Sequence, residues 1–295
     1  MKKRNLLLIA GLAVSLSACG GGTSEPSSNT DETTIQETDE PETSEEAASD
    51  LSIEQQTIFD QDGITISVTG ITEDSLFGPE LNLLIENNSD KNITVQARKS
   101  AINGYMISAT MSSDVASGKK ANDTLSFSSS ELDTCGIDTI ASIEFSLHIF
   151  DPDTFDTLYD SDLINLNTNM AEGFNQNYDS SGETIYDENG IKIVYKGLST
   201  DGSILGPEII LYVENNTDQV ITIQARDTSV NGFMIDPSLS TEITPGNKAV
   251  SGMTFFSDQL EENSITDFET VETSFHIFDG NYNTIVDTAP ITITP

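Results

Sequence analysis

The sequence predicts an all-β protein built from two tandem antiparallel β-sandwich domains that follow a disordered tether. Three observations support this prediction: a long internal repeat, an alternation of apolar and polar residues with a period of two, and Asn- and Gly-rich turns between the alternating runs. A period of two places one face of a strand in a core and the other towards water, whereas helices repeat every 3.6 residues.

The internal repeat has a spacing of 127–128 residues. GPELNLLIENNSDKNITVQARKSAINGYM begins at Gly78, GPEIILYVENNTDQVITIQARDTSVNGFM begins at Gly206, and about half of their positions are identical. A repeat this long indicates a duplicated domain, since solenoid units are shorter. We therefore expect domains at residues 51–168 and 183–295, joined by a polar linker at residues 169–182. The match also extends outwards, pairing Asp60–Ile64 with Asp187–Ile191 and Ser146–Asp151 with Ser274–Asp279.

Strands are expected wherever apolar residues alternate with polar ones. Ile64, Ile66 and Val68 alternate with Thr and Ser, and the segment 143–149 shows the same pattern. Turn signals separate the runs, because Asn and Asp tolerate left-handed backbone and Gly favours it. Each copy then yields seven or eight short strands, with a helical turn expected only at residues 131–139. These turns are Asp62-Gly63 and Asn189-Gly190, Asn87–Asp90 and Asn215–Asp218, and Asn103-Gly104 and Asn231-Gly232.

Many short strands in domains of about 110 residues fit an antiparallel sandwich of immunoglobulin-like type. The antibody signature of two Cys and a core Trp is absent, because the chain contains no Trp.

The first 18 residues predict a secretory signal peptide. Lys2, Lys3 and Arg4 precede an apolar stretch from Leu6 to about Val14, an order that is typical of such signals. The apolar stretch is shorter than the about 20 residues that a permanent membrane-spanning helix needs.

The signal ends in Leu16-Ser17-Ala18-Cys19, which resembles the lipobox of bacterial lipoproteins. That resemblance implies cleavage between Ala18 and Cys19 and a diacylglyceryl group on the thiol of Cys19. Two acyl chains anchor a protein stably where one does not. The expected location is the extracytoplasmic face of a cell membrane, with the membrane itself as the partner of Cys19.

A tether is expected at residues 19–50. After the Cys it contains ten acidic residues, no Lys or Arg, and Ile35 as the one large apolar residue. Such a segment buries too little apolar surface to offset the entropy of ordering it. We therefore expect a disordered spacer that holds the folded domains off the membrane.

The repeat also resembles the Ig-like modules of uncharacterised Firmicutes lipoproteins, in which a strand runs into an Asn-rich turn and then into a second strand. The matching residues are Leu83–Val95 and Leu211–Ile223. The resemblance implies a Gram-positive cell surface and an extracytoplasmic Ig-like fold, and it supplies no catalytic residue.

The charge balance excludes some partners. Residues 1–18 hold three of the 12 Lys and Arg and none of the 49 acidic residues, so the remaining chain has a net charge of −40. Nucleic acids and anionic lipid headgroups bind clustered positive charge, so neither is an expected partner. With Cys19 lipidated, Cys135 stands alone and no intrachain disulfide can form.

Residues for catalysis or metal binding are scarce. The two His residues, His148 and His276, occupy equivalent strand positions and are expected on the outer face of a sheet. Zinc needs three or four converging ligands, and the sequence shows no such cluster. Cys135 could pair with His148 as a nucleophile, but its counterpart in the second copy is Asn263. We therefore expect no enzymatic activity, no catalytic residue, no metal and no cofactor.

Weak calcium binding is an alternative hypothesis. Asp60-Gln61-Asp62-Gly63 resembles the start of a calcium loop, and Asp151, Asp153 and Asp156 form a second acidic group. The first lacks the later ligands of an EF-hand loop, including its closing Glu.

Basic residues recur at Arg98 and Arg226 and at Lys120 and Lys248. In so acidic a chain, we expect each recurring Arg to pair with a nearby carboxylate. The segments around these Arg residues and the following Asn-Gly turns match best between the copies. They form our candidate shared surface: Arg98, Asn103, Tyr105, Arg226, Asn231 and Phe233.

The sequence thus predicts a lipid-anchored surface protein with a non-enzymatic binding or envelope-structural role and a possible protein partner. The alternative is a surface lipoprotein that binds a solute, a carbohydrate or calcium. Sugar-binding platforms use exposed aromatic rings, for which Tyr105, Tyr159, Tyr195 and Tyr212 are the candidates.

Overall fold

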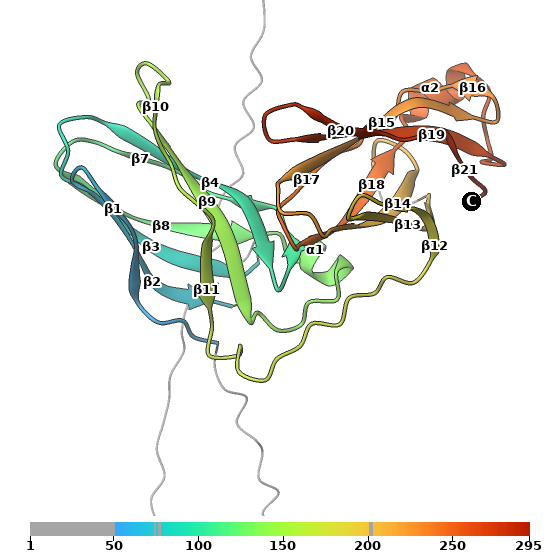
Figure 1. The fold of residues 1–295 in the computed structure, drawn as a ribbon. Coiled ribbons are helices and arrows are strands. Elements are labelled where there is room, and N and C mark those ends of the chain that lie inside the picture. The colour runs from blue at the N-terminus through green and yellow to red at the C-terminus, as the bar shows by residue number, and fades with distance from the viewer. Residues whose placement is uncertain (1–50, 74, 76–77, 201–202) are drawn as a thin grey trace, which may run out of the picture. The chain divides into compact units, whose positions relative to one another are not determined.

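The computed structural model describes residues 51–295 except 74, 76–77 and 201–202. The predicted signal peptide, the cleavage point between Ala18 and Cys19 and the tether at residues 19–50 lie outside the described residues. Strands predominate in the described part, which confirms the all-β prediction (Figure 1). Residues Ser49–Pro295 form one compact unit. No helix within the described residues is long and apolar enough to span a membrane.

The described residues of the first copy form eleven strands and one short helix. They are β1 (Gln56–Gln61), β2 (Ile64–Thr72), β3 (Glu80–Asn87), β4 (Ile93–Ile102), β5 (Tyr105–Met106), β6 (Ala109–Thr110), β7 (Ser112–Val115), β8 (Lys119–Phe127), α1 (Ser129–Thr134), β9 (Ser142–Phe150), β10 (Thr157–Asp160) and β11 (Ile164–Asn167).

The second copy repeats this order, with the isolated bridge between Ser238 and Thr254 in the place of β6. Its elements are β12 (Glu183–Glu188), β13 (Ile191–Ser199), β14 (Glu208–Asn215), β15 (Ile221–Val230), β16 (Phe233–Met234), β17 (Ser240–Ile243), β18 (Lys248–Thr254), α2 (Ser257–Glu262), β19 (Val271–Asp279), β20 (Thr284–Asp287) and β21 (Ile291–Ile293).

Each copy places two antiparallel layers around its own hydrophobic core. In the first copy, one layer has the order β1-β2-β3-β8 and the other has β10-β9-β4, with β7 on β4 and β11 on β9. The second copy repeats these layers as β12-β13-β14-β18 and β20-β19-β15, with β17 and β21 in the matching places. The predicted linker at residues 169–182 lies between the two copies.

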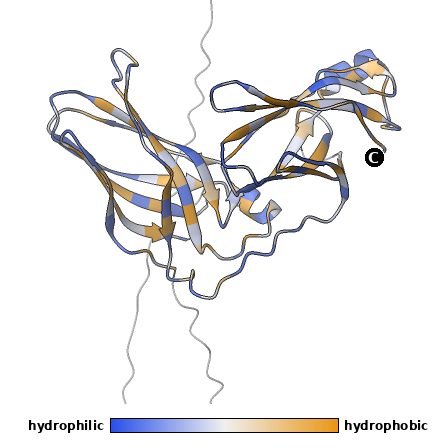
Figure 2. Ribbon diagram, in the orientation of Figure 1, coloured by the Kyte–Doolittle hydropathy of each residue, from blue (hydrophilic) through white to orange (hydrophobic). Residues whose placement is uncertain are grey.

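The residues that the sequence pattern predicts to face a core are buried in the structure, and the residues between them are more exposed. Ile64, Ile66 and Val68 on β2 are at most 2% exposed, while Thr65 and Ser67 between them are half-buried. Figure 2 shows this alternation of apolar and polar residues along the strands. Across the core, β9 supplies the buried Phe145, Leu147 and Ile149, and β19 supplies Phe275 and Ile277 in the second copy.

The predicted helical turn at residues 131–139 begins earlier, because α1 covers Ser129–Thr134. Its counterpart α2 at Ser257–Glu262 was not predicted from the sequence. Each helix buries one leucine, Leu132 or Leu260. A helix of six residues makes fewer than two turns, which is too short for a period of 3.6 to be read from the sequence.

The Asn-rich turns after β3 and β14 lie where the sequence predicts them, but their first residue is buried. Asn87 and Asn215 are 0% exposed. The Nδ2 group of Asn215 donates to the carbonyl groups of Gln219 and Ile243, both at 2.9 Å. Asn87 makes the same two contacts, with Lys91 at 2.8 Å and Val115 at 2.9 Å. Each amide therefore joins the turn to the end of the strand at the edge of the facing layer.

Candidate functional site

The candidate shared surface contains the tip of a β-hairpin in each copy. We call Asn103–Met106 and its equivalent Asn231–Met234 the hairpin tips. Asn103 and Gly104 have φ values of 49° and 81°, and Asn231 and Gly232 have 52° and 84°. Two consecutive left-handed residues make the tight turn that Asn-Gly favours. β5 and β16 then pair back on β4 and β15 with the same register.

The recurring Asn of each tip has a structural role. The Oδ1 atom of Asn103 accepts the backbone N–H groups of Ala141 and Ser142 at 2.8 and 2.9 Å, and its Nδ2 group donates to the Thr139 carbonyl at 2.6 Å. Asn231 repeats this pattern towards the loop before β19, accepting from Glu269 at 2.9 Å and Thr270 at 3.1 Å. Both tips are therefore held by the loop that leads into the long central strand.

The aromatic residues at the two tips differ in their surroundings. Tyr105 is 1% exposed, whereas Phe233 is 49% exposed and its neighbour Met234 is 68% exposed. The Tyr105 ring packs against Tyr178 of the linker segment and Tyr212 of β14, with centroids 5.2 and 6.3 Å apart. The tip of the first copy is thus buried inside the chain, and the tip of the second copy is open.

The first tip lies against the edge of the second copy. The backbone N–H of Lys248 on β18 donates to the Gly104 carbonyl at 2.9 Å, and the register pairs Lys248 with Tyr105 in parallel. This contact joins the layer β10-β9-β4 to β18-β14-β13-β12 as one ten-stranded sheet. Val194 and Tyr212 of the second copy consequently belong to the core cluster of the first.

A partly buried polar contact flanks the tip. The Oε1 atom of Glu144 on β9 accepts hydrogen bonds from the Thr244 hydroxyl at 2.9 Å and the Asn247 amide at 2.6 Å. Hydrogen bonds to a charged acceptor are stronger than neutral ones. The Lys248 ammonium lies 4.3 Å from the centre of the Tyr178 ring, within the range of a cation–π contact.

Burial of the aromatic cluster at this contact, formed by Tyr105, Tyr178 and Tyr212, disfavours the ionised form of the tyrosines. Burial raises the pKa of Tyr105 to about 12, with a smaller contribution from Cys135. Burial also raises the pKa of Tyr212 and of Tyr178. Two of the four tyrosines proposed as sugar platforms, Tyr105 and Tyr212, are therefore inside the protein.

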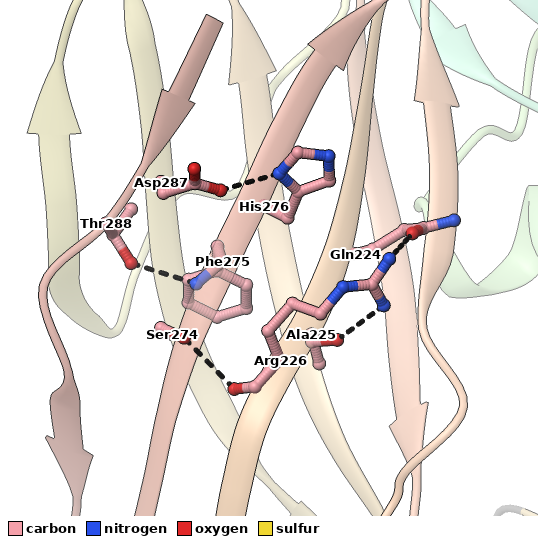
Figure 3. Close-up of polar contacts among 8 residues, drawn as sticks. All are labelled: Gln224, Ala225, Arg226, Ser274, Phe275, His276, Asp287 and Thr288. Atoms are coloured by element: carbon pink, nitrogen blue, oxygen red, sulfur yellow. Dashed lines mark hydrogen bonds and ion pairs between the residues drawn. The ribbon is translucent and has the colours of Figure 1, made fainter. Parts of the chain in front are cut away.

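A second repeated group lies on the outer face of β15 and β19, and of β4 and β9. The His276 Nδ1 atom lies 2.6 Å from Asp287 Oδ1 (Figure 3), and His148 lies 2.6 Å from Asp160. Each imidazole packs against the Phe two residues later, with centroids 5.2 Å apart. The His positions agree with the predicted outer face, although His148 is buried there.

The Arg residues of this face do not pair as the sequence suggested. Arg226 donates to the Ala225 carbonyl at 3.2 Å and to the side chain of Gln224 (Figure 3). Within the part of the chain that the structure describes, neither Arg98 nor Arg226 forms an ion pair, so the expected carboxylate pairing is wrong. Both side chains are exposed. Lys120 does pair, with Glu86.

Two acidic residues of the calcium hypothesis accept hydrogen bonds within the protein. Asp151 accepts the backbone N–H of Asp153 at 2.9 Å, and Asp62 accepts the hydroxyl of Tyr159. Among residues 51–295 outside the three gaps, no group of three or more His, Cys, Asp or Glu side chains is arranged to hold a metal ion.

Cys135 follows α1 and is buried in the first core. Burial, with the charge of Glu131 in addition, raises the pKa of its thiol to about 11. Because the thiolate is the reactive form, we expect the native fragment 49–295 to react with iodoacetamide at pH 8 about 100-fold more slowly than the same fragment in urea. Mass spectrometry of quenched samples measures both rates. Equal rates would contradict the burial of Cys135.

No protein-family model and no curated protein sequence matches this chain. Among solved structures, a YadV chaperone is similar with a TM-score of 0.24 at 14% identity, over 71% of this chain and 90% of that chain. A Salmonella enterica SafA pilin in complex with the SafB chaperone gives 0.18 at 12% identity, over 73% and 89%. A Porphyromonas gingivalis W83 protein of unknown function gives 0.18 at 11%, over 72% and 89%.

Proposed function

We propose that this chain is an exported lipoprotein, anchored through Cys19, that displays two β-sandwich modules for non-enzymatic docking at the cell surface. The observation that carries the proposal is the difference between the two hairpin tips. The same short motif is buried against a sheet edge in the first copy and exposed in the second, with Phe233 and Met234 open to solvent. Neighbouring exposed apolar side chains on a hairpin are typical of a docking surface.

The charge of the chain supports the same role. A net charge of −40 beyond residue 18 keeps such a molecule soluble and holds non-specific neighbours apart. A short apolar tip can then select its partner through shape and main-chain hydrogen bonds. This is the way in which the first tip meets β18.

The anchoring part of the proposal is tested with the two cysteines of the chain. Cys19→Ser is expected to abolish labelling by a radioactive or alkyne-tagged fatty acid and to move the protein from the membrane fraction to the medium. Cys135→Ser is the matched control, because it removes the only other thiol and should leave labelling and location unchanged. Fatty-acid labelling of the Cys19→Ser variant would contradict the assignment.

The docking part is tested with a photoreactive phenylalanine analogue at position 233 in living cells. Irradiation is expected to produce a defined cross-linked product. The control position is Phe155, an aromatic residue of the first copy that is 77% exposed but lies outside the tips. Docking through the tip would be disproved if position 233 gave no product beyond those at position 155.

A further inference from the structure

The contact between the two copies is heterologous, because a tip of one copy meets a sheet edge of the other. Such a contact joins two different surfaces. A tandem pair with one contact of this kind therefore leaves one tip and one sheet edge without a partner. The unused tip belongs to the second copy, and the unused edge belongs to the first copy.

The unused tip keeps the features that form the buried contact. Asn231 and Gly232 repeat the turn geometry of Asn103 and Gly104, and Phe233 replaces Tyr105. Glu272 pairs with Ser229 on β15, just as Glu144 pairs with Ala101 on β4. Glu272 therefore lies beside the second tip as Glu144 lies beside the first. Glu272 is exposed, whereas Glu144 accepts two hydrogen bonds from the second copy.

The unused edge is that of β8, the counterpart of β18. β8 pairs with β3 along its length and with β6 only at Ser126 and Phe127. Along Lys119–Leu125, no strand of the described chain covers its other side. Lys120 occupies the position on β8 that Lys248, which contacts the first tip, occupies on β18. Lys119 and Lys120 are both exposed.

The residues around this edge are altered in a way that matches the open tip. Lys119 replaces Asn247. In the intrachain contact, the Asn247 amide donates to Glu144. In the intermolecular contact, the Lys119 ammonium group would face the carboxylate of Glu272. Ala116 replaces Thr244, and the half-buried Leu84 replaces Tyr212 beneath the ring at position 233. Asn122 replaces Val250, which makes this face more polar than its counterpart. The intermolecular contact should therefore be weaker than the intrachain contact and reversible.

We propose that the hairpin tip Asn231–Met234 of one molecule docks on the β8 edge of a second copy of this chain, head to tail. This inference rests on the docking role proposed above and names its partner. A heterologous contact that does not close produces open chains of molecules. On a membrane, such chains would link anchored copies side by side, each held by its own tether.

Sedimentation velocity of the fragment 49–295, which forms one compact unit, tests the proposal. We expect association to grow with concentration from the micromolar to the millimolar range. Phe233→Asp removes the apolar ring of the tip, and Lys119→Glu reverses the charge at the β8 edge. Each variant alone should therefore remain monomeric. An equimolar mixture should form dimers and stop there, because one variant keeps the edge and the other keeps the tip. Lys119→Glu combined with Glu272→Lys should restore association.

Monomers at every concentration, or association that neither substitution weakens, would overturn the head-to-tail contact. Phe155→Asp is the control for a loss of exposed aromatic surface and should leave association unchanged. If the fragment stays monomeric while position 233 still cross-links to a different protein in cells, docking through the tip stands and self-association is rejected. Circular dichroism of each variant confirms that the fold is retained.

Discussion

Replacing Asn215 by leucine is expected to lower the free energy of unfolding of the second copy by about 3–5 kcal/mol. The side chain is 0% exposed and fills its hydrogen-bonding capacity on all sides. Its Nδ2 group donates to two carbonyls, and its Oδ1 atom accepts from the Thr217 backbone at 3.0 Å and hydroxyl at 2.7 Å. A leucine leaves the Ile243 carbonyl buried without this donor, and an unmade buried hydrogen bond costs more than a made one contributes.

Urea denaturation followed by tyrosine fluorescence measures this change, since the chain has no Trp. Asn216→Leu is the matched control, because Asn216 is the next residue and is exposed. Its effect should stay within about 0.5 kcal/mol, as is usual for surface positions. Similar losses for the two variants would show that the buried amide is not what closes this turn. Asn87→Leu and Asn88→Leu provide the same comparison in the first copy.

Tyr105→Ala is expected to destabilise the fragment 49–295 by about 3–5 kcal/mol, the usual cost of truncating a buried aromatic residue. The ring is 1% exposed and contacts Tyr178 and Tyr212. Its loss opens a cavity between the two copies and weakens the packing that holds β5 against β18.

Phe233→Ala is the control, since it makes the equivalent change at the exposed tip. Below the concentration at which molecules associate, its cost should be under about 1 kcal/mol. Chemical denaturation at low protein concentration measures both values, and faster proteolysis at the linker segment in Tyr105→Ala would report the opened contact. Equal costs would mean that the two tips are in similar surroundings, contrary to their exposures.

The strands could be predicted because their signal is local. Alternating residues on β2 or β9 have one face in a core, and that periodicity is present in the sequence whatever the strand pairs with. The turns could also be predicted, because Asn-Gly and Asp-Gly favour left-handed backbone by themselves. The helix α2 was missed because six residues are too few to show a helical period.

The candidate site could be predicted only in part from the sequence. The repeat directs attention to Asn103, Tyr105, Asn231 and Phe233, but two motifs that differ only in Tyr105 and Phe233 cannot reveal that one tip is covered. Glu144, Thr244 and Asn247, which surround the covered tip, were not among the candidates. Their signal was available in the differences between the copies, since Asn247 and Thr244 are replaced by Lys119 and Ala116.

The sequence by itself determined the strand pattern of the β-sandwich fold and the turn positions, because each depends on residues close together in the chain. It also determined the duplication, because the two copies can be compared directly at a spacing of 127–128 residues. The tertiary structure alone decided which of two matching tips is buried, that the exposed Arg98 and Arg226 form no ion pair among the described residues, and which edge strand stays open. Those outcomes depend on contacts between residues about 100 positions apart, as Glu144 and Thr244 are. The free energy of such contacts leaves no periodic signal in the sequence.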